Sequence, residues 1–385
     1  TLAAIERIEP RDRLGYMALL AHSRKIYDIG FTRLSTQPFN DFGTMLRQVP
    51  HLLGLRSYET VWGLVTRHLV SDKLRRAFSI QPLLVGGNPF DTTSIYGLIH
   101  FLEHAHGVHF AMGGTGSITR ALGELMNRQG IAVRLGTTVE RIRIEQGTAC
   151  GVELADGTGL AATVVVSNAD AAHLYQNMVP RAEQSLATRL KLAQAHYSMG
   201  LFVLYFGTTR TYPQVAHHTI WMGDRYRELL DDIFHRQKLA EDFSLYVHRP
   251  TATDPSFAPE GCDSFYVLCP VPNLQGKVDW ATEGPRLRNR IVAALERTLL
   301  PDLRATITAE FFKTPVDFKD NYQSVHGAGF SVAPIFRQSA WFRFHNRSES
   351  VRNLYLTGAG THPGAGLPGV LCSAKVVDAL IPLAS

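Results

Sequence analysis

The chain has 385 residues, of which 45% are hydrophobic and 19% are charged. A charged fraction below the ~25% of an ordinary soluble domain, at this length, excludes a disordered chain and indicates two or three structural units. The formal net charge is +5. All of this excess lies in residues 1–80, which hold 12 Lys or Arg against 7 Asp or Glu. A local basic excess points to an acidic partner or surface for that segment.

The cysteine content and the hydropathy of the sequence indicate the kind of cellular compartment in which the protein is expected. Four cysteines without a CxxC pair are too few for a disulfide framework at this length, which favours a reducing compartment. The sequence shows no signal-peptide pattern, and its longest apolar runs, such as residues 201–206, are far shorter than the ~20 residues that cross a bilayer. We therefore expect a protein that does not span a membrane, and a position on a membrane surface stays open.

Residues 1–112 are expected to form a helical segment, because apolar residues recur there at helical spacing. Ser71 is a plausible N-cap, and Gly107 ends a helix whose apolar stripe includes Ile95 and Leu102. Since these helices carry the basic excess, they resemble interfacial helices that bind anionic headgroups. A packed bundle with a solvated basic face is the alternative.

Residues 113–172 change character. A glycine turn at 113–116 leads into a helix that ends at Gly130. The predicted strands that follow are residues 131–135, 139–144, 150–154 and 160–166. The last of these is apolar throughout, which predicts a strand buried on both faces. The glycine turn is no dinucleotide fingerprint, because Thr119 replaces the third glycine and no acidic residue ends the next strand.

Residues 173–350 are expected to form an α+β unit large enough for a ligand cavity. Strands are predicted at 199–206 and 264–268, and an amphipathic helix at 286–300.

Residues 351–385 form a strand at 353–357, a loop at 358–368 and a helix at 369–380. The loop and the start of the helix hold five glycines, which lets the backbone approach a flat or phosphorylated ligand. The helix directs free N–H groups and a partial positive charge at that ligand. From these features alone, both a cofactor site and a tight structural turn are consistent with the sequence.

Histidine patterns give little support for a metal. His100, Glu103 and His104 match the H-x-x-E-H pattern of zinc hydrolases, but helical geometry places both histidines opposite the apolar stripe, away from the core, with no third ligand. The pair His217–His218 has no ligand-like spacing. We therefore predict no metal site and treat these histidines as structural.

Residues 353–367, NLYLTGAGTHPGAGL, followed by Ser373, resemble the signature of bacterial-type phytoene desaturases, which are flavin-dependent carotenoid desaturases related to amine oxidases. The resemblance runs through the whole chain and is strongest to the lycopene-forming enzymes. Further matching stretches are 83–90 (LLVGGNPF), 94–96 (SIY), 167–170 (SNAD), 202–207 (FVLYFG), 242–246 (DFSLY) and 258–261 (APEG).

The resemblance implies an α/β fold: an FAD/NAD(P)-binding flavoprotein with a mixed-sheet substrate domain and a helical membrane-facing segment. Residues 1–112 would be that helical segment, 113–172 and 351–385 parts of the FAD-binding domain, and 173–350 the substrate domain. The family's N-terminal strand–GxGxxG–helix unit has no counterpart in this sequence, so we expect the chain to carry about half of a flavin site and to lack at least one preceding βαβ unit.

The resemblance also assigns site residues. Gly358, Ala359 and Gly360 would approach the ribityl–pyrophosphate arm of FAD, and Gly369 and Val370 would lie under the isoalloxazine. The adenine side of the pocket would be formed by Val139, Asn168 and Ala169. The sequence names no certain catalytic base, and the candidates are His362 and Asp254.

The implied function is FAD-dependent desaturation of phytoene toward lycopene. The expected partners are a long apolar carotenoid and an anionic membrane surface, with the protein cytoplasmic and peripheral on the inner face of the cell membrane; no nucleic acid is needed to explain the basic segment. The alternatives are another carotenoid desaturase or a carotene isomerase, a non-catalytic membrane-attached remnant without flavin, and a zinc hydrolase acting through His100, Glu103 and His104.

Overall fold

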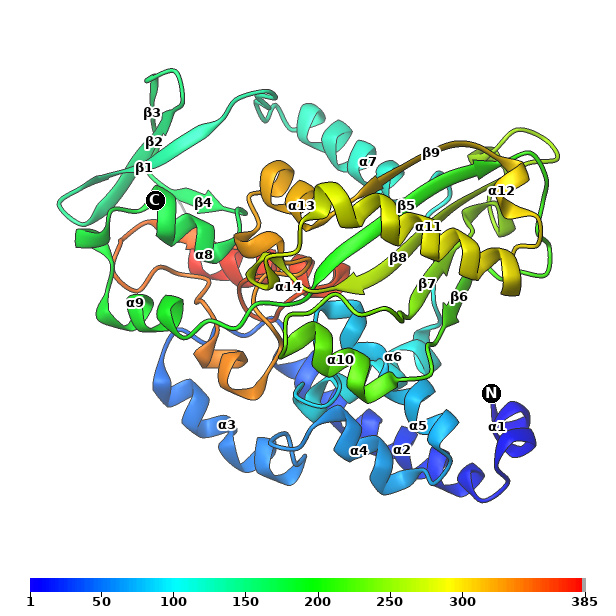
Figure 1. Cartoon of the computed structure of the whole chain (residues 1–385). Coiled ribbons are helices and arrows are strands. Elements are labelled where there is room, and N and C mark those ends of the chain that lie inside the picture. The colour runs from blue at the N-terminus through cyan, green and yellow to red at the C-terminus, as the bar shows by residue number, and fades with distance from the viewer. Residues whose placement is uncertain (383–385) are drawn as a thin grey trace.

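Helices make up the first part of the chain, as the apolar spacing predicts. The computed structural model describes residues 1–382 and places these helices together at one end of the molecule (Figure 1). They are α1 (Leu2–Ile8), α2 (Asp12–Tyr27), α3 (Phe42–Gly54), α4 (Val61–His68), α5 (Asp72–Ser79) and α6 (Leu98–His106).

The helical segment has its own apolar core and a buried polar tie. Leu19 and Ile26 of α2 pack against Leu64 of α4, and all three side chains are fully buried. The buried carboxylate of Asp12 accepts hydrogen bonds from the backbone N–H groups of Val70 (2.7 Å) and Ser71 (2.9 Å). Asp12 therefore joins the start of α2 to the connection between α4 and α5.

A five-stranded sheet is the largest β structure, with all neighbouring strands antiparallel in the order β6-β7-β8-β5-β9. One face packs on α11 (Trp280–Thr298), and the other packs partly on α10 (Tyr226–Phe234) (Figure 1). The strands are β5 (Gly200–Thr208), β6 (His218–Trp221), β7 (Leu245–His248), β8 (Asp263–Val271) and β9 (Ile307–Lys313). The predicted strands at 199–206 and 264–268 and the helix at 286–300 are confirmed.

Two smaller sheets bring distant parts of the chain together. An antiparallel meander contains β1 (Val139–Glu145), β2 (Thr148–Leu154) and β3 (Gly159–Ala161). A parallel pair contains β4 (Val165–Ser167) and β10 (Leu354–Leu356). Because β4 and β10 run in the same direction, the loops that follow them leave from the same edge.

Helices complete the connections. They are α7 (Thr115–Arg128), α8 (Ala171–His173), α9 (Leu186–Ala193), α12 (Leu303–Thr306), α13 (Pro315–Tyr322) and α14 (Leu367–Leu380). Among the described residues, no helix combines the length and the apolarity that crossing a bilayer requires. The last three residues of the predicted unit 351–385 lie outside the described residues.

Three predictions about this part of the chain are wrong. Residues 131–135 form no strand, because no neighbouring segment within residues 1–382 pairs with them. The predicted strand 160–166 is split between β3 and β4, which belong to different sheets. Val166 is 46% exposed whereas Val165 is 8% exposed, so β4 is covered on one face and open on the other rather than buried on both.

Candidate cofactor and substrate site

The loops after β4 and β10 touch closely. A Cβ atom at Gly358 would lie 2.5 Å from Asn168 Oδ1, and one at Gly360 would lie 2.9 Å from Ala171 Cβ. Gly358 also has a φ of 106°, which disfavours any other residue. In open sheets of this kind, ligands bind beyond the carboxyl ends of the parallel strands, where these two loops meet.

Two side chains hold the glycine loop against its surroundings. Ser373 on α14 accepts a hydrogen bond from the Gly358 N–H group (2.8 Å) and donates one to the Val370 carbonyl (2.7 Å). Asn346 Nδ2 donates to the His362 carbonyl (3.1 Å). The loop is therefore fixed from both sides.

Arg343 is a buried cation at the centre of this loop. Its side chain donates hydrogen bonds to the carbonyls of Ala359 (2.6 Å), Thr361 (2.9 Å) and Val332 (3.3 Å). Arg343 is 2% exposed, and this burial lowers the pKa of its guanidinium. Sequence reasoning missed Arg343, because it stands outside every motif and its role depends on carbonyls 11 to 18 residues away.

The donors around the loop fit a flavin dinucleotide. The N–H groups of Ala359 and Gly360 donate to no protein atom within residues 1–382. Ser331 Oγ is buried without a partner there, and a Cβ at Gly360 would lie 3.0 Å from it. The free N–H groups of the first turn of α14 add a partial positive charge. Backbone donors and a helix N-terminus are groups that bind a pyrophosphate or a reduced, anionic flavin.

The remaining cofactor residues lie around the same core. Val139 and Ala169 pack against one cluster that includes Val165 and Leu354 of the parallel pair. The structure thus brings the predicted residues after β4 together with those after β10. Gly369 lies in the first turn of α14, which begins at Leu367, two residues earlier than predicted.

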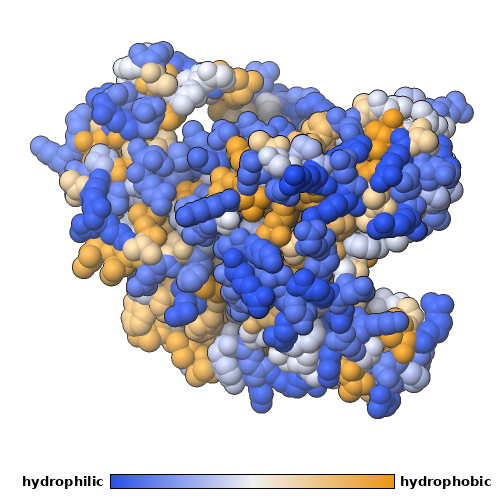
Figure 2. All heavy atoms as spheres, in the orientation of Figure 1, coloured by the Kyte–Doolittle hydropathy of each residue, from blue (hydrophilic) through white to orange (hydrophobic). Residues whose placement is uncertain are grey.

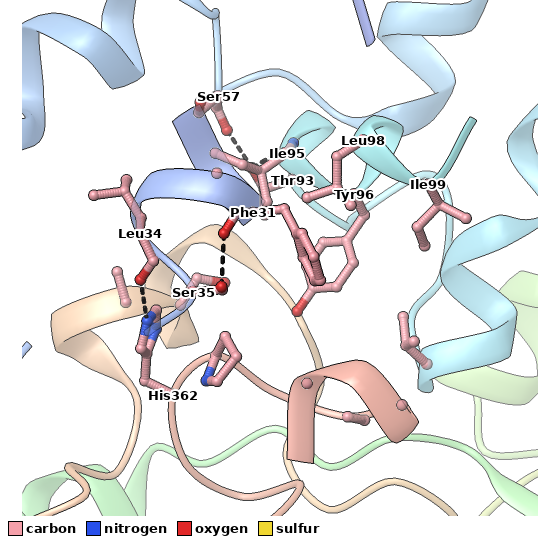
Figure 3. A pocket seen from close by; sticks show the side chains of 18 of the residues that line it. Phe31, Leu34, Ser35, Ser57, Thr93, Ile95, Tyr96, Leu98, Ile99 and His362 are labelled. Atoms are coloured by element: carbon pink, nitrogen blue, oxygen red, sulfur yellow. Dashed lines mark hydrogen bonds between the residues drawn. The ribbon is translucent and has the colours of Figure 1, made fainter. Parts of the chain in front are cut away.

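An apolar cavity of about 360 Å³ opens between the N-terminal helices and the glycine loop (Figure 3). Its polar side chains are mostly engaged with the backbone: Ser35 Oγ donates to the Phe31 carbonyl (2.6 Å), and Thr93 Oγ1 donates to the Ser57 carbonyl. The wall thus offers few free polar groups. Residues on the helical side include Phe31, Leu34, Met45, Leu52, Ile95, Tyr96, Leu98 and Leu102, and those on the loop side include His362, Pro363, Ala365, Gly366 and Gly369.

A second apolar cavity, of about 60 Å³, lies next to the first. Leu84 lines both, and the second is otherwise formed by α10 and by side chains of β6, β7 and β8 such as Ile220, Tyr246 and Leu268. Leu84 therefore separates two apolar cavities that lie between the helical segment and the five-stranded sheet.

The two candidate bases differ in position. His362 lines the large cavity, its Nε2 lies 2.9 Å from the Leu34 carbonyl, and burial lowers its pKa to about 4 (Figure 3). Asp254 lines neither apolar cavity. Its carboxylate accepts hydrogen bonds from the Gly113 N–H group (2.7 Å) and the Ser256 hydroxyl (2.7 Å), which lower its pKa.

The predicted orientation of His100 is wrong. His100 is 6% exposed, packs beside Phe78 and lies 3.2 Å from Gln81 through Nδ1, whereas His104 is exposed. His100 points toward α5, because neighbouring helices of the helical segment also cover the side of α6 opposite its apolar stripe. The sequence of α6 alone could not reveal this second buried side. The two histidines therefore point into different environments and do not form a common site.

Two solved oxidoreductase structures share this architecture. An oxidoreductase from Methanosarcina mazei superposes with a TM-score of 0.59 at 16% identity, covering 87% of this chain and 72% of that one. Cyclohexylamine oxidase from Brevibacterium oxydans superposes with a TM-score of 0.53 at 14% identity, covering 95% and 75%. The described chain therefore shares the fold of these two proteins.

Relatives in sequence show the family to which the chain belongs. Phytoene desaturase (lycopene-forming) from Pantoea ananas is 46% identical over 98% of this chain and 77% of its own length. The lycopene-forming enzyme from Paracoccus sp. is 47% identical over 96% and 74%, and a neurosporene-forming one from Rhodobacter capsulatus is 44% identical over 99% and 74%. The chain belongs to the phytoene desaturase family. No family model matches it.

Proposed function

We propose that this protein desaturates phytoene toward lycopene with FAD as its cofactor. One observation carries the proposal: the large apolar cavity ends at the glycine loop and at the first turn of α14. A long hydrocarbon held in that cavity lies beside the groups that would hold the flavin. When bound, FAD supplies the acceptor for a hydride taken from a saturated carbon next to a double bond.

The protein's own task is to position a substrate that offers no polar handle. The apolar walls exclude water and hold the chain by contact area rather than by hydrogen bonds. Gly366 and Gly369 line the end of the cavity, and Gly369 also lets the first turn of α14 pack closely on the glycine loop, because a Cβ atom there would lie 2.6 Å from the Gly364 carbonyl oxygen. Arg343 and Ser373 keep the glycine loop in the shape that the cofactor needs.

His362 is the better candidate to accept the proton that leaves with the hydride. Its Nε2–H group donates to the Leu34 carbonyl, so that Nδ1 keeps a free lone pair on a side chain that lines the cavity. A pKa of about 4 keeps the imidazole neutral at neutral pH. Asp254 has the different task of holding residues 113 and 256 in place.

The helix α3 is proposed to bind the inner face of the cell membrane. Phe42, Leu46 and Leu53 are 51%, 54% and 58% exposed, and we call these three side chains the apolar face of α3. Figure 2 shows hydrophobic residues gathered over the part of the surface where α3 lies. Met45 and Leu52 of the same helix line the cavity, so a carotenoid would pass from lipid to the cavity beside α3.

The expected division of the chain follows from this assignment. Residues 113–172 and 351–385 would belong to the FAD-binding part, because β4 and β10 form one parallel pair. Residues 1–112 and 173–350 would enclose the substrate between the helices and the five-stranded sheet.

Filling the cavity tests the proposal. Leu102→Trp on α6 adds an indole to the cavity wall and is expected to lower phytoene turnover at least tenfold while the FAD content stays unchanged. Leu125→Trp, at an exposed position on α7 outside the cavity, is the matched control and should retain turnover. Equal turnover of the two variants would argue against this cavity as the substrate site.

A further inference from the structure

Three histidines from two neighbouring strands meet at the outer edge of the five-stranded sheet. His218 begins β6, His248 ends β7, and the two face each other across the antiparallel pair. His217 directly precedes β6, and its ring centroid lies 4.3 Å from that of His218 and 4.7 Å from that of His248. One ligand atom from each residue falls within 4.8 Å of the other two. Sequence spacing did not reveal this cluster, because 30 residues separate His218 from His248.

The nitrogen positions suit a shared ion. Nδ1 of His218 and Nδ1 of His248 are 3.5 Å apart. Two ligands bound tetrahedrally to Zn²⁺ at about 2.0–2.1 Å have their nitrogens roughly 3.3 Å apart. Burial lowers the pKa of all three imidazoles, that of His248 to about 4, and the neutral imidazole is the form that binds a metal.

Hydrogen bonds also hold the three imidazole rings in place, and they leave one nitrogen of His217 free to bind another group. His217 Nδ1 is hydrogen-bonded to Thr253 Oγ1 (2.5 Å), while its Nε2 is buried and has no partner within residues 1–382. A side-chain hydrogen bond that orients one ring nitrogen and leaves the other free is typical of metal-binding histidines. The Tyr246 hydroxyl bridges the other two rings, 2.6 Å from His218 Nδ1 and 3.2 Å from His248 Nδ1.

We infer that His217, His218 and His248 bind one first-row divalent cation of the Zn²⁺ type. Three imidazoles leave the fourth position to water, which reaches it because His218 is exposed. The ion would replace the bridge made by the Tyr246 hydroxyl and would tie β6 to β7 at the sheet edge. None of the three histidines lines either apolar cavity, although Tyr246, which contacts two of them, lines the second. A metal site here departs from the expectation that these histidines are purely structural.

The test uses the untagged full chain loaded with FAD. Calorimetric titration with Zn²⁺ is expected to give one ion per chain, and Co²⁺ in its place should show the absorption of a tetrahedral complex. His218→Ala and His248→Gln should each weaken Zn²⁺ binding at least about 100-fold, more than the loss of an outer-shell group. His104→Ala, an exposed histidine on α6, is the matched control and should leave binding unchanged.

The hydroxyl of Tyr246 gives a second, independent readout. Tyr246→Phe removes the bridge but none of the ligands, so this variant should bind Zn²⁺ at least as tightly as the unaltered chain. FAD content and circular dichroism report whether each variant is folded; if His248→Gln fails to fold, the exposed His218→Ala carries the test. Absence of Zn²⁺ binding, binding that survives His218→Ala, or its loss in Tyr246→Phe would each overturn the assignment.

Discussion

Arg343 shows what a single buried residue contributes at this site. A guanidinium without contact to water is costly, and here at least three backbone carbonyls of two segments compensate for that cost. The same bonds fix the carbonyl of Ala359, whose N–H group donates to no protein atom within residues 1–382. The positive charge thus serves the shape of the glycine loop and raises the local potential for an anionic ligand.

Replacing Arg343 should therefore affect both stability and cofactor retention. Arg343→Met leaves buried carbonyls without donors, and we expect the free energy of unfolding to fall by about 3 kcal/mol or more and bound FAD to be largely lost. Urea denaturation and flavin absorbance per chain measure the two effects. Arg337→Met, at an exposed arginine six residues earlier, should change neither. An Arg343→Met protein with unaltered stability and FAD content would contradict the role described.

At the scale of elements, the burial of His100 on α6 makes the free energy of unfolding depend on pH. Burial of His100 lowers its pKa from the ordinary value of 6.5 to about 4, whereas His104 on the same helix is exposed. Between these two pKa values the unfolded chain binds a proton that the folded chain does not. The contribution of His100 to the free energy of unfolding is therefore largest above pH 6.5 and falls as the pH drops toward 4.

This dependence gives a measurable prediction. Between pH 7.5 and pH 5, His100 should account for about 2 kcal/mol of lost stability. His100→Leu should remove that part of the pH dependence, and His104→Leu should leave it intact. Urea unfolding of both variants at the two pH values checks this. If His100→Leu and the unaltered chain lose the same stability on acidification, the burial of a neutral His100 is refuted.

A second prediction at the scale of elements concerns the apolar face of α3. Leu46→Glu combined with Leu53→Glu removes two side chains that would each gain about 1.5–3 kcal/mol in lipid, so binding to phosphatidylglycerol vesicles should weaken at least about 100-fold. Leu186→Glu combined with Leu190→Glu changes two leucines on α9 that are 65% and 50% exposed, and it should leave binding unchanged. Co-sedimentation measures both pairs, and equal weakening would rule out α3 as the binding surface.

For the whole molecule, local sequence patterns predicted the structure correctly where residues adjacent in the chain determine it. The strand, glycine loop and helix of residues 353–380 were predictable because an apolar run, positive-φ glycines and a helical stripe follow one another directly. The assignment of a strand to 131–135 failed because periodicity cannot show whether a partner strand exists.

Contacts between distant segments could not be predicted in the same way. The hydrogen bonds of Arg343, the buried position of His100 and the three-histidine cluster all arise where segments 11 to 30 residues apart pack together. The cavity likewise needs the helical segment and the glycine loop, which are separated by most of the chain. The family signature indicated the chemistry, but the walls of the substrate site came from the fold.

The central claim concerns the joint position of this cavity and the flavin. The most direct measurement is turnover of phytoene in liposomes by the FAD-loaded full chain, followed by the visible absorbance of the products. We expect that polyenes with additional conjugated double bonds accumulate, that they require FAD, and that Leu102→Trp suppresses them. A folded, FAD-loaded, vesicle-bound protein that forms no desaturated product would contradict it.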